Sequence, residues 1–75
     1  MWDEEWRATV MEAALARVRR RARPKHFQIF ELYAVRNWDA AWVARELDVS
    51  RVQVYLVNHR LSGWLKDEIT RLEQR

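Results

Sequence analysis

Apolar positions along the 75-residue chain recur every three or four residues, the spacing of one face of an α-helix. No stretch alternates between apolar and polar residues as a half-buried strand would, and one Gly and one Pro leave little turn chemistry. The pattern predicts a small all-α domain of four helices with long first and last members. We expect a leading helix over 1–22, a central helix over 24–36, and two helices joined by a short turn over 39–73.

The N-terminal half contains two predicted helices separated by Pro24. Asp3 can cap the first helix, and Pro24 is expected to end it and to open the next at its first position. The central helix is apolar on most faces, so we expect it in the middle of the domain. One stripe of the first helix comprises Trp2, Trp6, Val10 and Ala13. We expect both tryptophans to pack on the last helix; otherwise they form an apolar patch that another domain or a second copy would cover.

The C-terminal half contains two candidate helix starts. Asp39 is expected to cap a helix over 40–47, and Ser50 a last helix that ends near Glu73. Between them, Asp48 occupies a position that often needs a left-handed backbone, which Asp tolerates. The inward stripe of the last helix is predicted to be Val54, Val57, Leu61, Leu65, Ile69 and Leu72. Two helices joined by so short a turn favour a helix-turn-helix.

The outward face of the last helix follows once Val54 is set inward, at about 100° per residue. Arg can pair with guanine, Gln with adenine, and an aliphatic side chain with a thymine methyl, so a face carrying all three suits the DNA major groove. An ordinary helical hairpin with exposed residues remains the alternative. The predicted outward residues are Val52, Leu56, His59 and Gly63, flanked by Tyr55 and Arg51 on one side and by Gln53 and Arg60 on the other.

The charge of the chain points to a polyanionic partner. Twelve of the 14 basic residues are Arg, and the formal net charge is +3. Arg binds phosphates and guanine edges with two parallel hydrogen bonds. Phosphate contacts are therefore predicted for the basic run at 17–26. A solvated helix end favoured by the helix dipole explains the run equally well. The candidate phosphate contacts are Arg19, Arg20, Arg23 and Lys25, together with Ser50.

Catalytic and metal-binding patterns are absent from the sequence. His26 and His59 lie far apart, and no nucleophile–base pair, Gly-rich phosphate loop or carboxylate pair accompanies them. We therefore predict a non-enzyme without a cofactor or a metal site. The lack of Cys suits a reducing, cytoplasmic compartment. No apolar run approaches the ~18 residues of a membrane span, and the acidic start MWDEEW is unlike a secretory signal.

Several joined features resemble region 4 of bacterial RNA polymerase sigma factors of the extracytoplasmic-function type. They are Ala14-Leu15, Phe30, Leu32, the stretch VARELDVS at 43–50, Gln53-Val54 and Arg60, within a likeness that covers about residues 10–73. The resemblance implies a winged-helix-like, sigma region 4 type fold. It implies that the last helix enters the major groove of the −35 promoter element. By the same resemblance, the DNA-reading positions are Tyr55, Leu56, His59 and Arg60, with Arg51 and Gln53 near the helix start.

The resemblance also implies protein partners, namely the β flap of the RNA polymerase core and an anti-sigma factor. The chain departs from the family at Asp48 and Val52, where Gly is usual, and at Trp42, where Glu is common. We expect Trp42 to mark a different partner contact. Nothing resembles region 2, so we expect the C-terminal domain of a longer sigma factor. The alternatives are a free-standing regulator of the same fold and a helical protein-interaction module that has lost its DNA contact.

Overall fold

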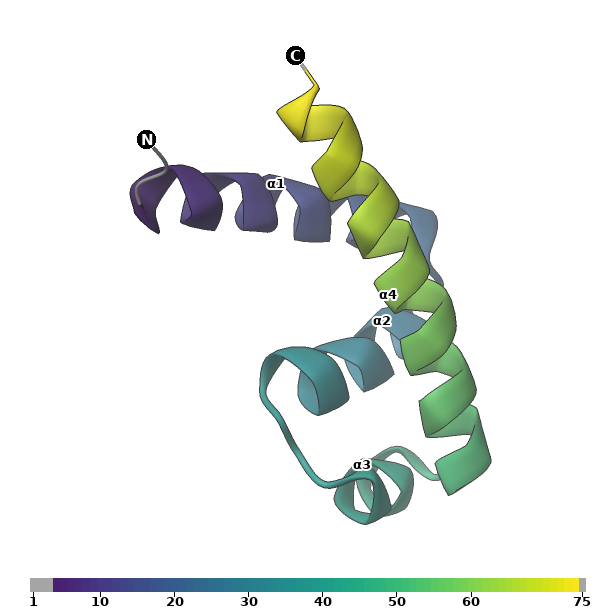
Figure 1. The fold of residues 1–75 in the computed structure, drawn as a ribbon. Coiled ribbons are helices and arrows are strands. Elements are labelled where there is room, and N and C mark those ends of the chain that lie inside the picture. Colours follow the sequence, from purple (N-terminus) through teal and green to yellow (C-terminus); the bar gives the residue numbers. More distant parts are fainter. Residues whose placement is uncertain (1–3, 75) are drawn as a thin grey trace.

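The structure, a computed structural model, describes residues 4–74, which form helices and no strand (Figure 1). The all-α class predicted from the sequence is therefore confirmed for this part of the chain. The first and last helices are the long ones, and α4 runs along the whole molecule, so every other helix packs against it. The elements are α1 (Glu4–Arg21), α2 (Pro24–Phe30), the π-helical turn η1 (Glu31–Val35), α3 (Ala40–Leu47) and α4 (Arg51–Glu73).

The boundary between α1 and α2 follows the prediction. Pro24 is at the start of α2, and Arg23 before it is extended, with φ −65° and ψ 144°. The ring of Pro fixes φ near −65° and lacks an N–H, which suits the first helical position. Acidic residues in the first turn of α1 and Arg19–Arg21 in its last turn match the helix dipole. The predicted cap at Asp3 lies outside the described residues.

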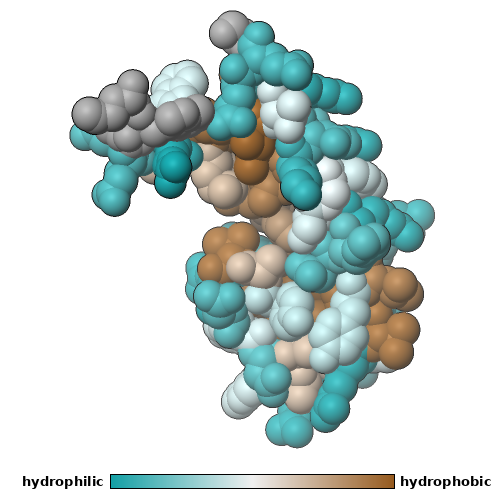
Figure 2. All heavy atoms as spheres, viewed as in Figure 1, coloured by the Kyte–Doolittle hydropathy of each residue, from teal (hydrophilic) through white to brown (hydrophobic). Residues whose placement is uncertain are grey.

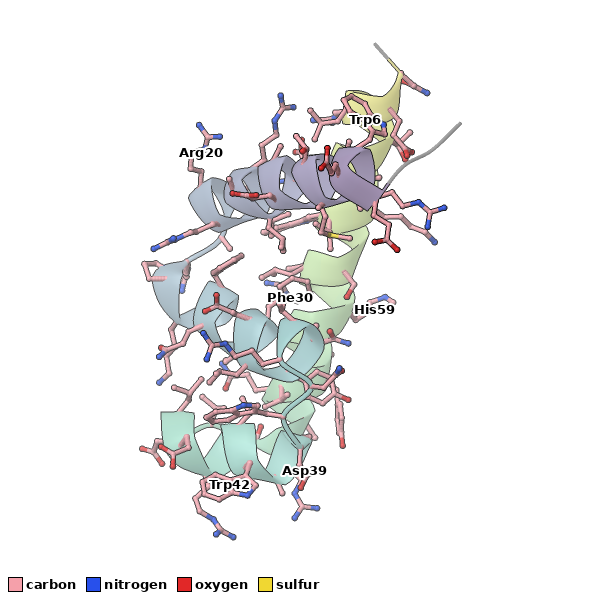
Figure 3. The ribbon with its side chains drawn as sticks, turned by 90° about the vertical axis from the view of Figure 1, so that its left-hand side faces the viewer. Trp6, Arg20, Phe30, Asp39, Trp42 and His59 are labelled. Carbon is pink, nitrogen blue, oxygen red and sulfur yellow. The ribbon has the colours of Figure 1, made fainter. Side chains whose placement is uncertain are left out.

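The sequence predicted one central α-helix over 24–36, but the structure divides this segment into α2 and η1, which together are called the central rod. Residues 31–35 form a π-helical turn, in which the N–H of Arg36 donates to the carbonyl of Glu31 at 3.0 Å. The chain then leaves the rod through Asn37, whose φ is 59°. A π turn widens the helix by one residue and leaves no simple mark in the spacing of apolar residues. The rod is central as expected, because Ile29 and Phe30 are buried (Figure 3).

The core of the described residues brings together two or three buried apolar residues from each of the four α-helices. Along α4, the predicted stripe is fully buried in its first half and half-buried in its second half, at Leu65, Ile69 and Leu72. The exception is Glu68, a buried carboxylate between these positions. The largest fully buried side chains are Val18 of α1, Ile29 and Phe30 of α2, Val43 of α3, and Val54 and Leu61 of α4.

The N-terminal end of α1 corrects one expectation. Trp6 is 49 % exposed and lies at the rim of a shallow hollow shared with Leu72, so it is not part of the core. Here α1 extends beyond α2 and α3, and only α4 runs close enough to cover it (Figure 1). Trp2 lies outside the described residues. Within residues 4–74, no helix combines the length and the hydropathy that a membrane crossing requires.

Candidate nucleic-acid interface

The turn between α3 and α4 is built by local hydrogen bonds. Asp48 is left-handed, with φ 55° and ψ 50°, as its place in the sequence predicted. The N–H of Val49 donates to the carbonyl of Ala44 at 2.9 Å, which satisfies one of the last carbonyls of α3. The hydroxyl of Ser50 then accepts from the N–H of Gln53 at 3.0 Å, confirming the predicted cap of α4. The turn thus fixes where α4 starts.

The cap of α3 differs from the prediction in one respect. Asp39 occupies the N-cap position with an extended backbone, at φ −61° and ψ 139°, but its carboxylate accepts no hydrogen bond from the start of α3. Helix α3 still begins at Ala40 as expected. Burial of Ala40 and Val43 against the core therefore supports this short helix in place of a side-chain cap.

The first turns of α4 present an exposed face of mixed chemistry. Val52 is 64 % exposed and Leu56 61 %, which places two aliphatic side chains in solvent as the helical geometry predicted. Figure 2 shows apolar side chains on the surface along this part of α4. Gln53 is half-buried, so only part of its side chain reaches the face. The polar residues around the aliphatic pair are Arg51, His59 and Arg60, all exposed.

Tyr55 is tied to the rest of the domain although it is half exposed. Its ring meets that of Tyr33 edge to face, with centroids 5.9 Å apart and planes at 77°. Such aromatic pairs contribute about 0.5–1.5 kcal/mol beyond the area they bury. Tyr33 comes from the π turn η1, so this turn supports the flank of the exposed face. Sequence reasoning did not pair these two residues, because the π turn sets the direction of Tyr33.

The basic run at 17–26 divides into two groups. Arg17 and Arg21 face α4, where their guanidinium groups lie 3.4 and 3.9 Å from the carboxylate of Glu68. Arg20 points to the opposite side of the molecule from His59 in Figure 3. Arg20 therefore does not continue the exposed face of α4 on the side of His59. The remaining group is exposed and comprises Arg19, Arg20, Arg23 and Lys25.

The carboxylate of Glu68 is the polar centre of the contact between α1 and α4. A third guanidinium, that of Arg71, lies 3.6 Å from it, and Arg21 also stacks over the ring of Trp64 at 4.4 Å. Three cations surround one buried anion, which offsets the cost of removing its charge from water. Sequence reasoning missed this cluster. The signal was present, since Leu61, Leu65, Glu68 and Leu72 share one helical face.

A second exposed apolar region lies between α1 and the central rod. Leu15, Phe27 and Val35 line a hollow of about 400 Å³, with Arg19 and Arg20 at its rim. Val35 is 47 % exposed. The hollow is lined by residues of α1, α2 and η1, and none of its lining residues comes from α4.

Metal ligands are not gathered in the described range, where no group of three or more His, Cys, Asp or Glu residues could hold an ion. Comparison of the chain with protein-family models, with curated proteins and with solved structures gives no match. The geometry of the exposed surfaces is therefore the basis for the function proposed below.

Proposed function

We propose that this domain binds double-stranded DNA by placing the first three turns of α4 in the major groove. The observation that carries the proposal is the exposed face of α4, where Arg51, His59 and Arg60 surround the aliphatic pair Val52 and Leu56. A fully structured helix with these side chains in solvent has donors for guanine or phosphate and methyl groups for thymine. The major groove is about 12 Å wide and admits one helix.

The arrangement of α3 and α4 supports a helix-turn-helix interpretation of this surface. In that motif the second helix reads base edges with its N-terminal residues, while the first crosses the DNA backbone. Here the turn at 48–50 is short, Ser50 caps α4, and the exposed face begins one residue after the cap. We assign base contacts to Arg51, Gln53, Tyr55, Leu56, His59 and Arg60 on this basis.

The resemblance to sigma region 4 refines the proposal. On this interpretation the domain reads a −35 promoter element and helps to position RNA polymerase during transcription initiation, in the cytoplasm, as part of a longer sigma factor. The hollow lined by Leu15, Phe27 and Val35 then offers an apolar site for the polymerase β flap or an anti-sigma factor. The domain acts as a binding module and performs no chemical step. A free-standing regulator would use the same exposed face of α4.

The proposal is tested by titrating isotope-labelled protein with a short random-sequence duplex at low salt and following the backbone amide signals. We expect shifts concentrated at residues 50–60 that fade as salt rises, because phosphate contacts release counterions. Shifts confined to residues 17–25 would contradict DNA binding by the exposed face of α4 and would leave only charge attraction to the basic run.

The second candidate function is that of a protein-interaction module without DNA contact. The exposure of Val52 at 64 % and Leu56 at 61 % favours it, since paired aliphatic side chains in solvent mark protein-binding sites as well. If the titration leaves residues 50–60 unchanged, this candidate takes first place. A protein partner would then cover the same two residues.

A further inference from the structure

The start of α3 carries an aromatic hollow that the DNA proposal does not use. Trp38, Asp39 and Trp42 line an open hollow of about 300 Å³. Asp39 and Trp42 lie at the end of the molecule opposite α1 (Figure 3). Trp42 is 54 % exposed and Trp38 is 39 % exposed, although buried Trp side chains are among the strongest contributors to a small core. Two large rings held in solvent at one place indicate a binding surface.

The two rings have the arrangement of a partial aromatic cage. Their centroids are 6.3 Å apart and their planes meet at 69°, so the face of one ring stands beside the edge of the other. The face of an indole attracts a cation through its quadrupole, and Trp does so best among the aromatic residues. The domain itself uses this interaction elsewhere, where the guanidinium of Arg21 lies 4.4 Å from the ring centre of Trp64.

Asp39 adds a negative charge to the hollow. Asp39 occupies the N-cap position of α3, but neither oxygen of its carboxylate accepts a capping hydrogen bond from the helix. Asp39 is exposed, and its charge is complementary to a cation placed over the rings. The same charge repels the phosphates of a nucleic acid, so the site differs in kind from the exposed face of α4.

We propose that the hollow of Trp38, Asp39 and Trp42 is a docking site for an arginine side chain of a protein partner. A guanidinium is planar, so it can stack on an indole while its edge donates two hydrogen bonds to one carboxylate. Lysine offers a point charge without the stacking plane, so arginine fits better. Arginine docking here does not depend on DNA binding, because none of the three residues belongs to the exposed face of α4.

The test uses the complete 75-residue chain, with indole N–H signals followed by NMR. The probes are acetyl-Ala-Arg-Ala-amide and its citrulline counterpart, which has nearly the same shape and no charge. We expect the arginine peptide at millimolar concentration to shift the signals of Trp38 and Trp42, while that of Trp64 serves as the internal reference. The citrulline peptide is expected to bind about two- to fivefold more weakly, which corresponds to an exposed cation–π contact of about 0.5–1 kcal/mol.

Two variants assign the contacts. Asp39→Asn keeps the shape of the side chain and should weaken the arginine peptide about two- to fivefold, as expected for an exposed ion pair. Trp42→Ala should abolish the shift at Trp38, and Trp42 is exposed enough for the fold to survive, which far-UV circular dichroism checks.

Three outcomes would overturn the proposal. Equal binding of the citrulline peptide would show that charge is not recognised. Stronger binding of acetyl-Ala-Leu-Ala-amide would make the hollow an apolar pocket. Shifts of the same indole signals by a short single-stranded oligonucleotide, with none from the arginine peptide, would assign the rings to base stacking instead.

Discussion

The two halves of α4 place their side chains in opposite ways. In the first half, Val52 and Leu56 are apolar and more than 60 % exposed, whereas in the second half Glu68 is charged and 5 % exposed. Both positions depart from the usual rule that apolar residues lie inside and charges outside. The departures occur for different reasons, since α1 covers the second half and no helix of the described chain covers the outer face of the first.

The difference separates the tasks of anchoring and binding along one helix. The second half packs on α1, where the half-buried Leu65 and the ion cluster of Glu68 lie. The exposed pair of the first half adds little to the stability of the free domain, because most of each side chain stays in water. We infer that residues on the outer face of the first half can change with little effect on folding, while residues of the inner face cannot.

The largest expected effect comes from truncating the shared core. Leu61→Ala removes a side chain with no exposed surface and should lower the free energy of unfolding by about 2–5 kcal/mol. Leu56→Ala, five residues earlier on the outer face, should change it by less than about 0.5 kcal/mol. Urea unfolding followed by circular dichroism measures both. Similar losses for the two variants would erase the distinction between the inner and outer faces.

The next effect concerns DNA binding at the outer face. Arg60→Ala should weaken binding to a preferred duplex by about 1–3 kcal/mol if Arg60 pairs with a base, and should leave the unfolding free energy unchanged. Lys66→Ala is the matched control, because Lys66 is an exposed cation in the other half of the same helix. Fluorescence anisotropy of a labelled duplex measures the affinities. An equal loss for both variants would mean that charge alone is recognised.

A smaller effect is expected at the anchoring half. Glu68→Gln leaves the three guanidinium groups of the cluster facing each other without their anion, and should lower stability by about 1–2 kcal/mol. The neighbouring exposed Asp67→Asn should have almost no effect. Thermal unfolding of both variants at low salt gives the comparison. An unchanged midpoint for Glu68→Gln would show that the cluster does not hold α1 in place.

The smallest effect is expected from the basic run. Arg20→Ala should weaken binding to preferred and random duplexes alike. It should also reduce the slope of log affinity against log salt concentration by up to about one, the contribution of a single phosphate contact. Titrations at several salt concentrations provide that slope. Since Arg20 and His59 point to opposite sides, a single duplex need not touch both, and an unchanged slope would place this cation outside the interface.

Helix boundaries could be predicted because single residues mark them. Pro24, Asp48 and Ser50 each act through their own backbone or side chain, and the structure places all three as expected. The outward face of α4 could also be predicted, because helical periodicity fixes the direction of each side chain once Val54 is placed inside. The DNA-binding role of that face stays a prediction.

The remaining features depend on contacts between distant elements. The exposure of Trp6 follows from how far α1 extends past its neighbours, which periodicity within α1 does not reveal. The pairing of Tyr33 with Tyr55 follows from the π turn. Helical spacing could have placed Glu68 on the inner face, but not its partner Arg17, which lies 51 positions away in the chain. Such features belong to the assembled fold rather than to any one segment.

The span between Arg17 and Glu68 has a consequence for the order of folding. Closing a segment of 51 positions loses more chain entropy than forming the short turn at 48–50. We therefore expect α3 and α4 to associate early, with α1 joining after the folding barrier. In that case Glu68→Gln raises the unfolding rate and barely changes the folding rate. The ion cluster would then govern how long a folded molecule lasts rather than how quickly it forms.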